Sequence, residues 1–116
     1  MQWNPEALLD RLGGDEELAR QMAALFVDEC PNMLDDVRRA VAAGSADDIR
    51  RVAHAVKGSV ANFVADGPAA IALALEHAGR DERLTDAPAL LARLEGAVAE
   101  LIPELRIYGS GDLCAS

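Results

Sequence analysis

Apolar side chains recur every three or four residues along most of this chain, which is the period of an amphipathic α-helix. No stretch alternates apolar and polar residues with the period of two that marks a β-strand, and the sequence contains no internal repeat. The pattern therefore predicts four long helices that follow a short one. We expect these helices to span residues 5–12, 16–43, 46–64, 67–79 and 87–107.

Residues that favour helix ends lie at the predicted boundaries. Side chains that can cap a helix N-terminus precede the helices, namely Asn4, Asp15, Ser45, Asp66 and Asp86. Pro5 follows the first of them and suits the first helical position. Gly44 and Gly79 lie where the second and fourth helices should end, and Gly is common just past a helix C-terminus.

Pro31 lies inside the predicted helix over residues 16–43. A proline lacks an amide donor and clashes with the preceding turn, so it either kinks or breaks a helix. The apolar spacing keeps its phase across Pro31, which favours one kinked helix over two separate helices. This spacing runs through Leu18, Met22, Leu25, Phe26, Glu29, Met33, Val37 and Val41.

Four amphipathic helices joined by short loops predict an all-α fold, an antiparallel up-down-up-down four-helix bundle. The first helix is too short to be stable alone. We therefore expect residues 1–14 to form a lid across one end of the bundle, within the same domain. The bundle itself should occupy residues 15–107, and the Gly- and Ser-containing segment 108–116 should form a flexible tail.

The chain has 116 residues, enough for one domain with its own core, and a net charge of −9. Such a charge repels phosphate backbones and anionic membranes, so we expect no nucleic-acid or membrane partner. Neither a signal peptide nor an apolar run of membrane length is present, which predicts a cytoplasmic protein. We also expect this protein to be a monomer. A fragment of a longer, membrane-anchored kinase is the alternative. Cys30 and Cys114 match no disulfide framework or metal-site spacing.

His54 lies in the predicted helix over residues 46–64, on the side opposite the apolar stripe of that helix. At about 100° per residue, its side chain points roughly 150° away from the centre of the stripe. The stripe consists of Ile49, Val52, Ala53, Val56, Val60 and Phe63. His54 should therefore be exposed to water, and its neighbours on that outer face are Arg50, Arg51, Lys57, Gly58 and Ala61.

The neighbours of His54 indicate a chemical role for its ring. Gly58 removes the side chain one turn after His54, where a larger residue would lie beside the imidazole. Lys57 is close enough to compensate negative charge placed on the ring. An exposed imidazole is largely neutral near pH 7 and can act as a nucleophile. An accessible ring, a nearby ammonium group and a cleared approach together indicate a phosphoryl acceptor.

The segment His54-Ala55-Val56-Lys57-Gly58-Ser59 resembles the signature of histidine phosphotransfer (HPt) domains. The resemblance covers most of residues 15–106. It continues downstream through Ala61-Asn62-Phe63, Ala65-Asp66, Leu75-Glu76 and Gly79-Arg80. The chain departs from the family pattern at Val60, Val64 and Gly67-Pro68.

The resemblance implies that Nε2 of His54 takes a phosphoryl group from an aspartate of one receiver domain and passes it to an aspartate of another. Lys57 would compensate charge and Gly58 would leave steric access. The chain would need no cofactor or metal of its own, because the receiver domain supplies an acidic pocket and Mg²⁺. Expected partners are response-regulator receiver domains and a hybrid sensor histidine kinase, docking on Arg50, Arg51, Lys57, Gly58 and Ala61.

No glycine-rich nucleotide loop is present, which predicts a phosphocarrier rather than an enzyme. One alternative stays open, a catalytically silent helical interaction module that binds receiver domains or other helices. A di-metal or haem bundle is disfavoured, because a His54–His77 pair lacks supporting ligands and the Glu-x-x-His pattern of di-iron bundles is absent. His77 has no Lys or Gly at the matching positions, so we interpret it as a structural residue.

Overall fold

The computed structural model describes residues 3–63 and 65–110, and within these ranges it contains helices and no strand. The helices are α1 (Pro5–Arg11), α2 (Glu16–Ala43), α3 (Ala46–Ala61), α4 (Asp66–Arg80) and α5 (Ala87–Ser110). The all-α fold predicted from the apolar pattern is confirmed, with every helix end within three residues of the one expected.

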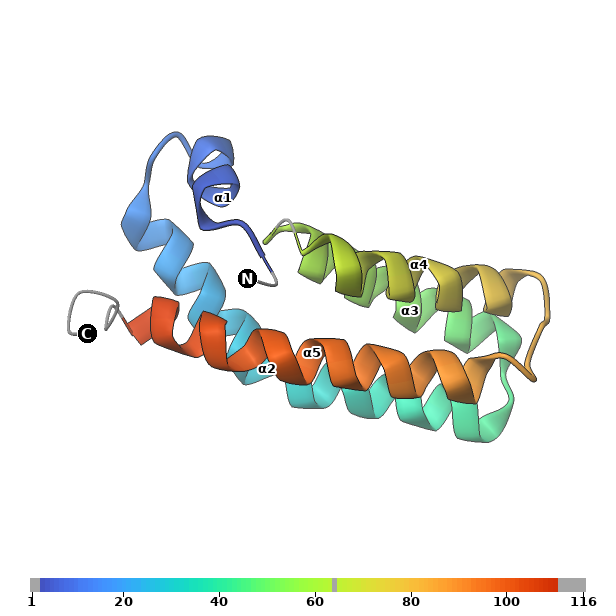
Figure 1. Cartoon of the computed structure of the whole chain (residues 1–116). Helices are drawn as coiled ribbons and strands as arrows, with labels where there is room; N and C mark the ends of the chain where they lie inside the picture. Colours follow the sequence, from blue (N-terminus) through green and yellow to red (C-terminus); the bar gives the residue numbers. More distant parts are fainter. Residues whose placement is uncertain (1–2, 64, 111–116) are drawn as a thin grey trace.

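The four long helices run alternately up and down along one bundle (Figure 1). Each of them packs against two neighbours, with α2 and α4 each lying between α3 and α5. The short helix α1 lies across one end of the bundle, as Figure 1 shows. Two hydrogen bonds attach this segment to the end of α3, from Asn4 N to Phe63 O at 3.2 Å and from Arg11 Nη1 to Ala61 O at 3.1 Å. The predicted four-helix bundle with an N-terminal lid is therefore confirmed.

Short polar side chains begin the first three helices, as predicted. Asn4 accepts a hydrogen bond from the amide of Ala7, and Asp15 accepts one from Leu18, each at 3.0 Å. Ser45 caps α3 in the same way, and Gly44 ends α2 in the left-handed conformation at φ 64°. The prediction for α4 is wrong by one residue. Asp66 is its first helical residue, and the cap position is taken by Ala65, which is buried and offers no side-chain acceptor.

Helix α2 continues through Pro31 without a break and changes direction along its blue-to-cyan length in Figure 1. The single kinked helix predicted from the apolar phase is therefore the correct alternative. In the first half of the helix the predicted stripe is right at Met22 and Phe26 but wrong at Leu18 and Leu25. These leucines are 40% and 56% exposed, whereas Ala19 and Ala23 are buried. Helix α5 approaches this half of α2 closely, and a Cβ on Gly109 would lie 3.0 Å from the amide nitrogen of Ala24. Small residues are needed where two helices approach so closely.

The flexible tail was predicted over residues 108–116, and this predicted start is too early. Helix α5 extends to Ser110, and the Tyr108 ring is buried against Trp3 with ring centroids 4.9 Å apart. Trp3 also contacts Phe63, which contacts Phe26, so all four aromatic residues of the chain meet where the lid joins the bundle. These edge-to-face contacts hold the end of α5. Residues 111–116, with Cys114 among them, lie outside the described residues.

Gly79 was predicted to end α4. It lies instead inside α4, at the contact with α3. A Cβ on Gly79 would lie 2.6 Å from the amide nitrogen of Arg50 and 2.7 Å from the carbonyl oxygen of Ala46. The left-handed residue of the turn after α4 is Glu82, at φ 58°. Gly79 is therefore the residue that lets the backbones of α3 and α4 approach each other.

We expect Gly79→Ala to lower the free energy of unfolding by about 1–3 kcal/mol, because the added methyl group meets backbone atoms that no rotamer change can move. Urea denaturation followed by circular dichroism measures this change. Gly96→Ala is the matched control, since Gly96 lies in α5 with no atom within 4 Å of its Cβ position. That control should raise the stability by about 0.5–1 kcal/mol. Equal effects of both variants would contradict the role assigned to Gly79.

Candidate functional site

The side chain of His54 projects from the outer face of α3 and is 66% exposed. The opposite face of the same helix is buried in the bundle through Ile49, Ala53, Val56 and Val60. The helical period therefore placed His54 correctly, and the ring is open to a partner that approaches from solvent.

Glu76 of α4 contacts the His54 ring, and sequence reasoning gave it no role. Its Oε1 lies 3.2 Å from Nδ1 of His54. An ionised carboxylate can only accept hydrogen bonds, so Nδ1 must donate. The neutral ring then carries its proton on Nδ1, and the lone pair is left on Nε2. The contact thus selects the tautomer and fixes the orientation of the ring.

Lys57 shares the same carboxylate oxygen, since its Nζ lies 3.0 Å from Oε1 of Glu76. The sequence predicted an ammonium group near the imidazole, and the structure shows that group paired with Glu76 and partly buried. Glu76 and Lys57 cancel each other's charge, so the group formed by His54, Lys57 and Glu76 is neutral while the ring is neutral.

Opposing effects act on the pKa of Glu76. Desolvation raises it, but hydrogen bonds from Lys57 and His54 and the charges of these two residues together lower it below the ordinary value for glutamate. Glu76 is therefore ionised at neutral pH. A carboxylate whose pKa is lowered by folding stabilises the folded state at neutral pH, and this contribution is lost as the pH falls through the lowered pKa.

Gly58 has no packing role within the described part of the chain. A Cβ added there would have no atom within 4 Å, in contrast to the crowded position of Gly79. A glycine inside a helix costs about 0.5–1 kcal/mol relative to alanine, and no contact in this structure offsets that cost. The open space at Gly58 lies one turn from His54, where it leaves room for a partner to reach the ring.

Arg50 and Arg51, predicted as docking residues, are each paired with an aspartate of the same helix. Arg50 pairs with Asp47 at 3.0 Å, and Arg51 pairs with Asp48 at 3.3 Å, each within α3. Both arginines remain exposed on the helix. They can therefore contact a partner, but their charge is already compensated locally.

Ala61, the last of the predicted contact residues, lies at the junction of α3 with the lid. Its carbonyl oxygen accepts the hydrogen bond from Arg11. The structure thus distributes the predicted residues along the whole outer face of α3, with His54 between Arg50 and Ala61.

Two other residues considered in the sequence, His77 and Cys30, have structural roles. His77 is partly buried in α4, and no group of three or more potential ligands among the described residues could hold a metal ion. Cys30 is buried in the core, where desolvation raises the pKa of its thiol. Within residues 3–63 and 65–110, no helix combines the length and apolarity needed to cross a membrane.

Comparison with known proteins agrees with this geometry. Residues 21–104 match the family described as the Hpt domain. The chain is also similar to the crystal structure of histidine-containing phosphotransfer protein B (HptB) from Pseudomonas aeruginosa. The two are 25% identical with a TM-score of 0.86, over 94% of this chain and 95% of that one. No curated protein matches the sequence.

Proposed function

Because the chain belongs to the Hpt domain family, we propose that it carries phosphoryl groups in a phosphorelay on His54. Proteins of this family act as phosphocarriers rather than as classical enzymes. The observation that carries the proposal is the exposed His54 ring, whose Nδ1 is tied to Glu76 and whose Nε2 is therefore the free nucleophile. The donor is an aspartyl phosphate of one receiver domain, and the acceptor is an aspartate of another.

In the proposed transfer, the Nε2 lone pair of His54 attacks the phosphorus atom of the aspartyl phosphate. The bond between phosphorus and Nε2 forms while the bond between phosphorus and the aspartyl oxygen breaks, and the aspartate leaves as a carboxylate. The Nδ1 proton stays on the ring, which gains positive charge. The Glu76 carboxylate, already accepting from Nδ1, stabilises that charge. Transfer to the second receiver domain is the reverse of these steps.

Lys57 supplies charge compensation in this scheme. Its ammonium group is held by Glu76 on the same side of α3 as the His54 ring. Three donors on the ammonium group allow it to keep Glu76 and to contact a phosphoryl oxygen on the ring. The Mg²⁺ needed for the reaction belongs to the receiver domain, and none of the steps requires a metal ion bound to this chain.

The docking surface is the outer face of α3, with Arg50, Arg51, Lys57, Gly58 and Ala61, and the adjoining edge of α2. The exposed leucines of α2 supply an apolar part of this surface. Leu18 and Leu25 share the helical spacing of Met33, which lines a recess beside α3 together with Ala55. Exposed apolar side chains that share one helix edge are typical of protein–protein contacts.

The proposal is tested with purified receiver domains charged by acetyl phosphate. Incubation with the protein should give a phosphorylated species in intact-mass spectra that is stable in base and lost in acid, as expected for phosphohistidine. Addition of a second, uncharged receiver domain should remove the label. Receiver domains that bind the chain without transferring a phosphoryl group would contradict the proposal and identify a silent interaction module instead.

Glu76 should act as a positioning residue for His54. Glu76→Ala removes the acceptor for Nδ1–H, and we expect transfer to slow by roughly tenfold or more. Glu76→Gln keeps an accepting oxygen and should recover part of the rate. Glu95→Ala is the matched control, because Glu95 also joins two helices, through Arg38 at 2.6 Å.

The imidazole tautomer separates positioning from a purely structural role of Glu76. Nitrogen NMR chemical shifts of the His54 ring should show the Nδ1–H form in the wild type and a mixed population in Glu76→Ala. A slower transfer with an unchanged tautomer would contradict the positioning role.

A further inference from the structure

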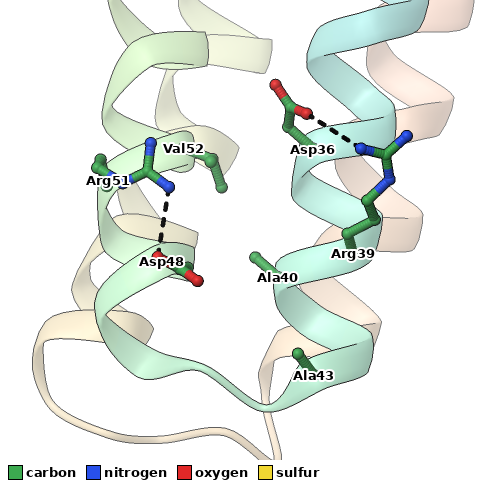
Figure 2. Close-up of a pocket in the computed structure, with 7 residues that line it drawn as sticks. All are labelled: Asp36, Arg39, Ala40, Ala43, Asp48, Arg51 and Val52. Atoms are coloured by element: carbon green, nitrogen blue, oxygen red, sulfur yellow. Dashed lines mark hydrogen bonds and ion pairs between the residues drawn. The ribbon is translucent and has the colours of Figure 1, made fainter.

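A groove lies between α2 and α3, close to the turn that joins them. Its wider part has a volume of about 380 Å³ and is drawn in Figure 2. It is lined by Asp36, Arg39, Ala40, Ala43, Asp48, Arg51 and Val52. A smaller recess of about 140 Å³ shares Asp36, Arg51 and Val52 and extends to Ala55, the residue after His54. Both recesses lie on the α2 side of α3, and the smaller one reaches the residue that follows His54 in the chain.

Short side chains form the apolar surface of this groove. Ala40 and Ala43 of α2 lie opposite Val52 of α3, and none of the three reaches far enough to fill the space between the helices (Figure 2). An aliphatic side chain from a partner would bury apolar surface there, at about 25 cal/mol per Å² removed from water.

The charged walls of the groove do not close it. Arg39 pairs with Asp36 at 4.0 Å within α2, and Arg51 pairs with Asp48 at 3.3 Å within α3. No ion pair within the described part of the chain joins α2 to α3. By contrast, the Arg38–Glu95 pair joins α2 to α5.

Both arginines of the groove are available to a partner. Their side chains are 79% and 65% exposed, and exposed pairs within one helix contribute little to stability. Carboxylates of a partner can therefore replace Asp36 and Asp48 as the ion-pair partners of these arginines at little cost in free energy. In a chain with a net charge of −9, the groove is locally neutral, because Arg39 and Arg51 offset Asp36 and Asp48, and its two exposed guanidinium groups are where carboxylates of a partner can be accommodated.

We propose that this groove determines which receiver domain the protein serves, by taking an aliphatic side chain of that domain flanked by carboxylates that meet Arg39 and Arg51. The inference rests on the proposed function, because a receiver domain that docks over the outer face of α3 to reach His54 would also contact Arg51 and Ala55, which line the groove. A receiver domain that lacks the aliphatic side chain or the carboxylates loses these contacts and docks less well.

A second groove, between α2 and α5, supplies matched controls. It has a volume of about 440 Å³ and is lined by apolar residues with Arg38, Glu95 and Arg106, and no residue of α3 contributes to it. Ala99 in this groove corresponds to Ala43, since both are exposed alanines in a helix. Arg106 corresponds to Arg39 in charge and exposure.

The experiment compares Ala43→Leu and Arg39→Glu with the controls Ala99→Leu and Arg106→Glu. The probe is the acetyl-phosphate-charged receiver domain that transfers fastest to the wild type. Labelling by phosphoramidate, a small donor that needs no docking, is measured in parallel. The rate from the receiver domain, divided by the rate from phosphoramidate, should fall by about tenfold or more in the groove variants. It should stay within about twofold of the wild type in the controls.

The outcomes separate this inference from the proposed function. If the groove variants keep the wild-type ratio, the inference is overturned while the proposed function stands. If no receiver domain labels the wild type, the proposed function fails first. A change in self-association of the groove variants, with the ratio unchanged, would assign the groove to a second copy of the chain and would also overturn the inference.

Discussion

Replacement of His54 with glutamine is expected to abolish acid-labile labelling of the protein by a phosphorylated receiver domain. Glutamine has no ring nitrogen and cannot form the phosphoramidate bond, so the loss should be complete within the detection limit. The fold should survive, because the His54 side chain is exposed and its polar contact within the described residues is a surface pair with Glu76. Exposed substitutions of this kind change the free energy of unfolding by about 0.5 kcal/mol or less.

The second histidine of the chain provides the control for this experiment. The sequence contains two histidines, and His77 lies partly buried in α4. His77→Gln should keep wild-type labelling, with the rate followed in the same intact-mass assay. Labelling that survives His54→Gln, or that is lost in His77→Gln with the fold intact, would contradict the assignment of His54.

Replacement of Gly58 with leucine is expected to slow transfer from a receiver domain by roughly 100-fold. The side chain would occupy the open space one turn from His54 and keep the two reacting atoms apart, and misplacement by about 1 Å can have an effect of this size. Stability should rise slightly, because leucine favours a helix by close to 1 kcal/mol over glycine. Stopped-flow or quenched-flow measurement of transfer, together with urea denaturation, checks both expectations.

Gly96→Leu is the matched control for Gly58→Leu. Gly96 also lies within a helix with no atom within 4 Å of its Cβ position, but on α5 rather than α3. It should gain the same helix stability and transfer at the wild-type rate. If the two leucine variants transfer equally fast, the open space at Gly58 has no role in access to His54.

Local features of the chain were predictable because their physical causes lie within a few residues. The caps at Asn4, Asp15 and Ser45 depend on a side chain and an amide three residues later, and all three hydrogen bonds are present. The exposure of His54 follows from the helical period alone. The continuous helix through Pro31 also follows from the phase of the apolar residues on either side.

Features that depend on how two helices meet were not predictable from these patterns. Glu76 lies 22 residues from His54, and their contact requires the close approach of α3 and α4 that Gly79 permits. A glycine near the end of an apolar stretch has the same pattern whether it ends a helix or allows a close contact. The sequence therefore predicted the wrong role for Gly79 and no role for Glu76.

The apolar spacing also assigned to the core two leucines that are exposed. Leu18 and Leu25 fit the helical period, yet alanines occupy the buried positions because α5 lies so close to α2 there. Spacing alone cannot distinguish a leucine that points into the core from one that points about a quarter turn away from it around the helix axis. In this chain the difference matters for the proposed function, because we assign the exposed leucines to the docking surface.

The position of the phosphoryl group on the wild-type protein tests the central claim most directly. Phosphorus and nitrogen NMR of the labelled protein should show the group on Nε2 of His54, with the proton retained on Nδ1 towards Glu76. A phosphoryl group on Nδ1, on His77 or on a carboxylate would contradict the account, because the lone pair that the Glu76 contact leaves free would then not be the nucleophile.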